Sequence, residues 1–258
     1  MLEGIADKGS YEAEAILQLK INLYHRTGQD DKAWALVEAN IQIESFRRKA
    51  IEGKIEERDF QAAKKLINDF LDKQDRHTYS NISWDTLLLD IALEEGDIPA
   101  IRTLAFEFIE NRFIKEYYEI YKDTFSPAEW ATERENLFLH YYSKDYFSNS
   151  AADLLAAEHD ASRLLNYVEE YLSVNELEKY YKAFAPSYPK KTLELFKRAL
   201  VSYAEQHTGR FHYKRILSLL KDMARIKGGK KAALELAAEF KMRYKNRRAM
   251  IEILGEFN

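Results

Sequence analysis

The chain repeats one pattern of polar and apolar positions along nearly its whole length. Each copy is a polar turn followed by an amphipathic helix with Ala and Leu at helical spacing, most clearly in Thr27–Leu36, Glu57–Leu66 and Glu95–Leu104. Such a unit predicts a stack of helical hairpins, because one hairpin cannot bury its own apolar face and needs neighbours. The pattern therefore indicates a scaffold.

The spacing of the turns favours a degenerate array over a strict one. Successive turn anchors are 29 to 40 residues apart, whereas tetratricopeptide repeats run to about 34 residues and HEAT-like repeats to about 40 to 47. We expect an all-α fold, an α-α superhelix or right-handed solenoid of about six or seven degenerate TPR- or HEAT-like helical hairpins. The turn anchors are Gly28, Arg58, Gly96, Ser126, His159, Tyr188 and Gly228.

The composition agrees with one continuous helical domain. Nine Gly and four Pro in 258 residues leave little material for β-turns, and the sequence lacks the alternating β-branched runs that signal strands. No linker rich in Gly, Ser or Pro divides the chain, so we expect residues 1–258 to form a single helical-repeat domain. Because the helical pattern begins abruptly at about Tyr11, we expect a fragment of a longer protein.

The sequence has no cysteine, which excludes disulfides and thiolate metal sites in this chain. No apolar run approaches the roughly 20 residues that span a bilayer, and Met1–Ile5 does not have the character of a signal peptide. We expect a cytoplasmic protein with no membrane partner.

Charge is distributed unevenly. Residues 190–258 hold 17 Lys or Arg against 7 Asp or Glu, so they form a basic part after an acidic part, residues 1–189. Clustered basic charge can mark a polyanion site, but it also occurs on solvated helix faces or where two parts of an assembly attract each other. The candidate polyanion contacts are Lys214, Arg215, Lys230, Lys231, Arg243, Lys245, Arg247 and Arg248.

Residues 244–254 have a second, local interpretation as a terminal capping helix. An apolar strip can form from Tyr244, Ala249, Met250 and Ile253. The polar face that a terminal repeat needs would then come from the outward-projecting Lys245, Arg247 and Arg248.

The sequence contains little catalytic chemistry. Gly228–Lys231 lacks the upstream glycine and the Ser or Thr of a phosphate-binding loop and is typical of a turn. His207 and His212 lack the spacing and the glutamate of a zinc protease helix, and the paired carboxylates lie at turns or on polar faces. We predict no enzyme, no catalytic or metal residue, no cofactor and no small-molecule substrate.

Tyrosines give the clearest indication of binding. Seventeen are present, and three adjacent pairs lie in helical segments. Neighbours on a helix point about 100° apart, so one member of each pair should border solvent or a groove, where Tyr is favoured for binding. The alternative is that both rings are half-buried between helices. The candidate partner-binding residues are Tyr117, Tyr118, Tyr121, Tyr141, Tyr142, Tyr146, Tyr180 and Tyr181.

Two segments resemble a known family. Residues 41–47 (Ile-Gln-Ile-Glu-Ser-Phe-Arg), between the turns at Gly28 and Arg58, resemble the helical region that follows the zinc finger in bacterial SWIM zinc-finger proteins. Residues 244–254 are similar to that family's closing pattern of Tyr, a basic pair, Ala, an apolar residue and Glu-x-Leu. The finger needs Cys ligands, so the resemblance implies its C-terminal helical-repeat region without the finger, in a bacterial cytoplasmic protein.

Two functions remain open. The first is a non-catalytic helical-repeat scaffold that binds a protein or peptide partner within a larger SWIM zinc-finger-type protein. The alternative is an accessory nucleic-acid-binding module that uses the basic part, residues 190–258.

Overall fold

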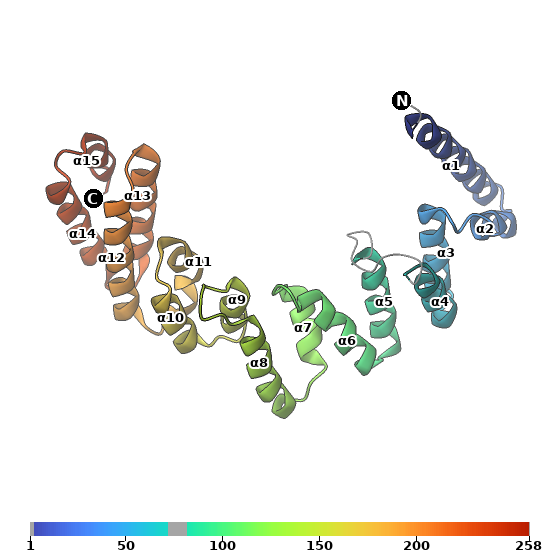
Figure 1. The fold of residues 1–258 in the computed structure, drawn as a ribbon, viewed down its shortest axis with the longest axis horizontal. Coiled ribbons are helices and arrows are strands. Elements are labelled where there is room, and N and C mark those ends of the chain that lie inside the picture. The colour runs from blue at the N-terminus through green and yellow to red at the C-terminus, as the bar shows by residue number, and fades with distance from the viewer. Residues whose placement is uncertain (1–2, 72–81, 258) are drawn as a thin grey trace. The chain divides into compact units, whose positions relative to one another are not determined.

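The computed structural model describes residues 3–71 and 82–257, which contain fifteen α-helices and no strand (Figure 1). The predicted all-α class is confirmed. The helices are α1 Glu3–Arg26, α2 Asp30–Glu38, α3 Glu44–Glu56, α4 Phe60–Leu71, α5 Ile82–Glu95, α6 Ile98–Ile109, α7 Lys115–Asp123, α8 Pro127–Tyr141, α9 Asn149–Ala157, α10 Ala161–Glu170, α11 Val174–Phe184, α12 Pro189–Gln206, α13 Arg210–Arg225, α14 Gly229–Arg243 and α15 Arg248–Leu254.

The seven turn anchors lie between the two helices of seven successive pairs, from α1–α2 to α13–α14, and α15 follows as a final single helix. Within residues 3–71 and 82–257, the seven helix pairs agree with the predicted six or seven hairpins. Ser126 caps α8 with its hydroxyl oxygen and forms a capping box with Glu129, with Pro127 at the first helical position, as this local sequence predicts.

Four of the turns share one backbone geometry. Gly28, Arg58, Gly96 and His159 have φ angles of 70°, 59°, 67° and 54°. In each case the next residue donates its backbone N–H to the carbonyl five residues earlier, at 2.8 to 3.0 Å. This is the Schellman arrangement, in which a left-handed residue ends a helix. It reverses the chain, so that the second helix of the hairpin can pack on the first.

In three of these turns the next residue is an aspartate that starts the following helix. The carboxylates of Asp59, Asp97 and Asp160 accept the backbone N–H groups three residues later, at 3.1 to 3.2 Å. Side-chain capping of this kind stabilises a helix by about 1 kcal/mol. One short sequence thus ends the first helix and begins the second.

The apolar pattern of the repeat also has a structural cause. The fifth residue after each left-handed position is buried, with an exposed fraction of 0 to 4%: Ala33, Ala63, Ile101 and Leu164. This position lies in the first turn or two of the second helix. Ala33 and Ala63 belong to buried clusters that also contain residues of the first helix of their pair.

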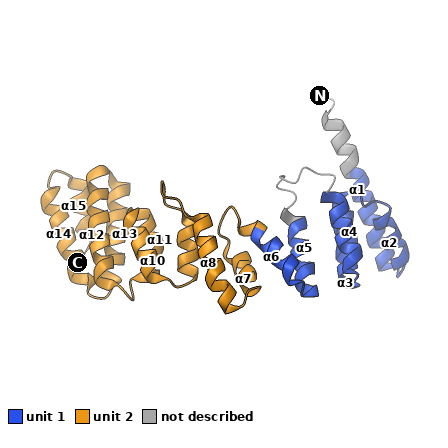
Figure 2. Cartoon of the chain, turned by 60° about the horizontal axis from the view of Figure 1, so that its bottom comes forward, with its two compact units in different colours: residues 1–106 blue, residues 107–258 orange. Residues whose placement is uncertain are grey.

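The contacts divide the chain into two compact units, residues 1–106 and 107–258 (Figure 2). The boundary falls within α6 and not at the change of charge near residue 190. Within each unit, helices pack against their neighbours in sequence order, which is the arrangement of an α-helical solenoid. That residues 1–258 form a single domain stays a prediction.

The first unit has a layered core. Ile21, Val37 and Phe46 form one buried cluster from α1, α2 and α3. Ile51 and Trp84 belong to the next cluster, which is made by α3, α4 and α5. Because α3 contributes to both clusters, each layer depends on its neighbours, as expected of stacked repeats.

Ion pairs in the second unit often join residues about one repeat apart. Arg163 contacts Glu135 at 2.8 Å, and Arg198 contacts Glu169 at 2.7 Å. The terminal helix α15 buries Met250 and Ile253, as predicted for a capping helix. In the described part of the chain, no helix has the length and apolar character needed to cross a membrane.

Candidate functional site

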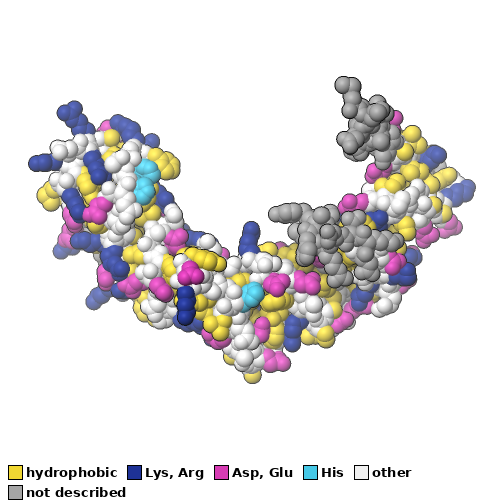
Figure 3. All heavy atoms as spheres, in the orientation of Figure 1, with side chains coloured by type: hydrophobic (Ala, Val, Ile, Leu, Met, Phe, Trp, Pro, Cys, Tyr) yellow, Lys and Arg dark blue, Asp and Glu magenta, His cyan; other side chains and the backbone are white. Residues whose placement is uncertain are grey.

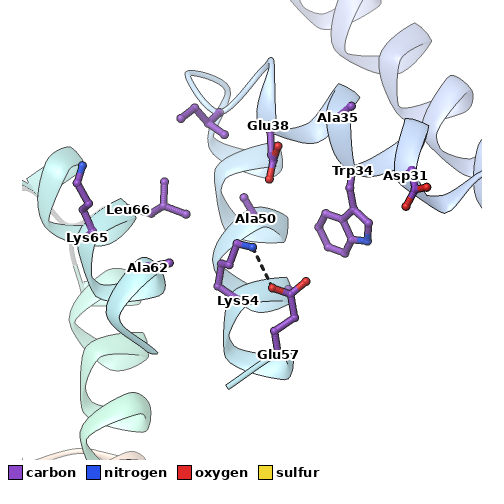
Figure 4. Close-up of a pocket in the computed structure, with 12 residues that line it drawn as sticks. Asp31, Trp34, Ala35, Glu38, Ala50, Lys54, Glu57, Ala62, Lys65 and Leu66 are labelled. Atoms are coloured by element: carbon purple, nitrogen blue, oxygen red, sulfur yellow. Dashed lines mark hydrogen bonds and ion pairs between the residues drawn. The ribbon is translucent and has the colours of Figure 1, made fainter. Parts of the chain in front are cut away.

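A groove of about 570 Å³ lies in the first unit among α2, α3 and α4 (Figure 4). Its apolar lining comes from small and aliphatic side chains, and the indole of Trp34 stands beside it. Charged side chains from all three helices complete the lining. We call it the Trp34 groove, and its residues are Asp31, Trp34, Ala35, Glu38, Ile41, Ala50, Gly53, Lys54, Glu57, Ala62, Lys65 and Leu66.

The position of Trp34 depends on a glycine in the neighbouring helix. A Cβ atom on Gly53 would lie 2.5 Å from Cη2 of Trp34, so only glycine leaves room for the ring. Glycine within a helix costs about 1 kcal/mol relative to alanine, and here the close approach of the ring explains its presence. Trp34 nevertheless remains 36% exposed. The indole is therefore held in place and still accessible.

The charges at the groove differ in their partners. Lys54 forms an ion pair with Glu57 at 2.9 Å, and its hydrogen bond to that carboxylate raises the pKa of Lys54. Lys65 forms an ion pair with Asp69 at 2.7 Å. The two carboxylates that α2 contributes to the groove, Asp31 and Glu38, have no ion-pair partner among the residues that the structure describes.

This arrangement suits a cationic side chain with an apolar stem. A guanidinium or ammonium group is attracted to the face of an indole and to the carboxylates of Asp31 and Glu38. The methylene stem of Lys or Arg can lie on apolar surface, which Ala50, Ala62 and Leu66 provide. The sequence predictions did not include Trp34 or Gly53. The signal that could have indicated the contact was Gly53 itself, a glycine inside a helical segment.

The predicted tyrosine residues are placed differently from one another. Tyr117 and Tyr142 are half-buried, Tyr146 is exposed, and the other five are buried. Tyr180 and Tyr181 are both buried, with Tyr181 in the wall of a hollow of about 340 Å³. Tyr121 donates to Glu133 at 2.7 Å, and Tyr141 donates to the Ile109 carbonyl at 2.5 Å. These hydroxyls hold helices together, and a binding role for the eight tyrosines stays a prediction.

Tyr118 belongs to a buried polar network around Glu158. The Glu158 side chain is only 8% exposed and accepts hydrogen bonds from Tyr118, from Lys122 at 2.6 Å and from the Trp130 indole N–H at 3.2 Å. Burial alone would raise the pKa of Glu158, but these hydrogen bonds outweigh it and hold the pKa below its ordinary value. The network ties α7 and α8 to the end of α9.

The predicted polyanion contacts do not all present free charge. Arg215 contacts Glu178 at 2.8 Å, and Arg243 forms an ion pair with Glu205. Arg247 donates to the Ala204 carbonyl and lies 4.1 Å from the centre of the Tyr244 ring. The expectation that Arg247 projects outward is wrong, because the end of α12 offers carbonyl acceptors. The remaining five are exposed, although Lys231 also lies 3.8 Å from a carboxylate oxygen of Glu235: Lys214, Lys230, Lys231, Lys245 and Arg248.

Histidine side chains gather at the surface over α12 and α13 (Figure 3). His207 and His212 have ring centres 4.8 Å apart, and Tyr203 bridges them, since its hydroxyl lies 2.7 Å from Nδ1 of His212 and its ring stacks on His207. In the described residues, no group of three or more His, Cys, Asp or Glu could hold a metal ion. The pair is explained by packing with Tyr203.

Comparisons with protein-family models, curated proteins and solved structures gave no match. The function is therefore inferred from the surface of this chain.

Proposed function

We propose that this chain is a non-catalytic helical-repeat scaffold that binds a basic segment of a partner protein in the Trp34 groove. The observation that carries this proposal is the accessible indole of Trp34. It lines the same groove as the carboxylates of Asp31 and Glu38 and several apolar side chains. An aromatic ring with nearby hydrophobic contacts is typical of the residues that dominate binding energy at protein interfaces.

The resemblance of residues 41–47 and 244–254 to bacterial SWIM zinc-finger proteins supports the proposal that this scaffold is part of a larger protein of that type. In that proposal the array lies in a cytoplasmic protein downstream of a zinc finger. The scaffold would hold a partner while the finger makes its own contacts.

Peptide binding tests the groove directly. The probe is a fluorescein-labelled peptide with alternating Arg and Leu, and the control peptide has Glu in place of Arg. We expect Trp34→Ala to weaken binding about tenfold, because a desolvated cation–π contact and its packing contribute about 1 to 2 kcal/mol. The double variant Asp31→Asn with Glu38→Gln should weaken binding of the Arg peptide. It should not weaken binding of the Glu peptide, because neutral groups no longer repel the Glu side chains.

The matched control for Trp34 is Leu139→Ala, which removes an exposed apolar side chain from the second unit. This control should bind like the unmodified chain. Equal affinity of Trp34→Ala and the unmodified chain for the Arg peptide would contradict the proposal.

A second candidate function is nucleic-acid binding through residues 190–258. The five exposed cations, at positions 214, 230, 231, 245 and 248, favour it. Contacts to phosphates release counterions, so such binding must weaken steeply as salt rises. A labelled DNA or RNA that the chain fails to shift at low salt would remove this candidate.

A further inference from the structure

The first helix carries an exposed apolar stripe. Ile16, Leu19 and Leu23 are 55%, 67% and 59% exposed, and hydrophobic side chains reach the surface along α1 (Figure 3). Another face of α1 packs into the first unit through Leu17, Ile21 and Tyr24. At about 100° per residue the centres of the two sets lie about 130° apart around the helix, so the stripe is a separate face from the one in the core.

Charged residues continue the stripe at both ends. Positions 12, 16, 19, 23 and 26 follow each other at alternating spacings of four and three residues, the seam of a two-helix coil. Glu12 stands at one end of this seam and Arg26 at the other, and both are exposed. The seam is therefore acidic, then apolar, then basic.

We propose that this seam binds a second copy of the same chain, with the two α1 helices antiparallel. In an antiparallel pair, the Glu12 end of each seam lies beside the Arg26 end of the other, and the apolar residues meet in the middle. A parallel pair would bring Glu12 against Glu12 and Arg26 against Arg26. The seam is thus complementary to itself under a two-fold axis, which is the condition for a symmetric dimer.

The dimer should be weak and reversible. The seam has only three apolar residues per copy. We therefore expect the dimer to bury less surface than the minimum of about 1,200 Å² that stable interfaces bury. We expect a dissociation constant on the order of 10 μM. The seam does not include any residue of the Trp34 groove, so dimerisation and peptide binding are separate proposals.

Sedimentation equilibrium of the full chain, from about 1 to about 300 μM, tests the dimer across the range of weak interfaces. We expect the unmodified chain to pass from monomer to dimer, and Leu19→Glu to remain a monomer. The matched control is Leu139→Glu, because Leu139 in α8 is also 67% exposed. It should dimerise like the unmodified chain. A monomer at every concentration, or a dimer that Leu19→Glu leaves intact, would overturn the proposal.

Charge reversal tests the antiparallel arrangement. Glu12→Lys and Arg26→Glu, each alone, should raise the dissociation constant about 3- to 10-fold, because each reversal creates two like-charged contacts per dimer. The double variant should restore the original value, since both contacts regain opposite charges. Single variants with unchanged association, or a double variant as weak as the singles, would overturn the arrangement. Circular dichroism should show the same helix content in all variants.

Discussion

Glu158 carries a charge that is almost buried in the second unit. Its carboxylate accepts hydrogen bonds from Tyr118 and Trp130 and forms an ion pair with Lys122. We expect Glu158→Gln to lower the free energy of unfolding by about 2 to 3 kcal/mol at pH 7, because it removes a charged acceptor from buried donors. Urea unfolding followed by circular dichroism measures this loss.

The loss should depend on pH in a defined direction. The folded state holds the pKa of Glu158 below the ordinary value of 4.5. Its stabilisation is therefore complete above the unfolded pKa and disappears as the pH falls through the lower folded pKa. The unmodified chain and Glu158→Gln should converge in strong acid. Glu135→Gln is the control, because the Glu135 side chain is 42% exposed and its exposed pairs contribute about 1 kcal/mol or less. A difference that persists unchanged in acid would contradict this account.

At the scale of the helical elements, the sequence predicts the turns inside hairpins well. The signals are local: a capping serine before Pro127, or a left-handed residue followed by Asp97 or Asp160. The turns between hairpins at residues 39–43 and 110–114 precede helices whose N-cap residues, Ile43 and Ile114, make no side-chain cap. Packing between repeats therefore has to position these turns. The Trp34 groove was not predicted for the same reason. It depends on a contact between Trp34 of α2 and Gly53 of α3.

Gly53→Ala isolates this contact between two helices. The added methyl group gains about 1 kcal/mol of helix propensity, but it would lie 2.5 Å from the far end of the Trp34 ring. Because this ring is partly exposed and can rotate, we expect a change in stability of about 1 kcal/mol or less. We also expect a displaced indole and weaker binding of the Arg peptide.

Nuclear magnetic resonance of the indole N–H groups measures the displacement. The Trp34 resonance should shift in Gly53→Ala, while those of Trp84 and Trp130 serve as internal controls and stay in place. An unchanged Trp34 resonance would mean that Gly53 does not set the position of the ring.

At the scale of the whole molecule, the uneven charge has a partial structural explanation. Arg198 pairs with Glu169 and Arg215 with Glu178, so cations of the basic part meet carboxylates that lie before residue 190. From composition alone, three explanations of the basic part were open: attraction between two parts of an assembly, charge on solvated helix faces, and binding of a polyanion. Composition could not separate them because the pairs depend on the register between stacked repeats, which the three-dimensional packing sets.

In a stack of repeats, a destabilising substitution should affect mainly the helices next to it. Gly229 begins α14, and a Cβ atom there would lie 1.9 Å from the backbone oxygen of Met223 and 3.0 Å from Leu193. The backbone cannot yield as a side chain can, so we expect Gly229→Ala to cost about 2 to 4 kcal/mol. In an array with nearest-neighbour coupling this loss stays local.

Hydrogen exchange followed by mass spectrometry shows whether Gly229→Ala destabilises only the neighbouring helices or the whole chain. In Gly229→Ala, amides of α12 to α15 should exchange faster, while those of α2 to α4 keep their rates. The control is Lys230→Ala, which changes the exposed neighbouring residue and should leave both sets unchanged. Equal acceleration in α2 to α4 would mean that residues 1–106 and 107–258 unfold together. The division into two compact units predicts the opposite. In the first unit each buried cluster is built by helices that are adjacent in sequence, so its packing does not depend on α14.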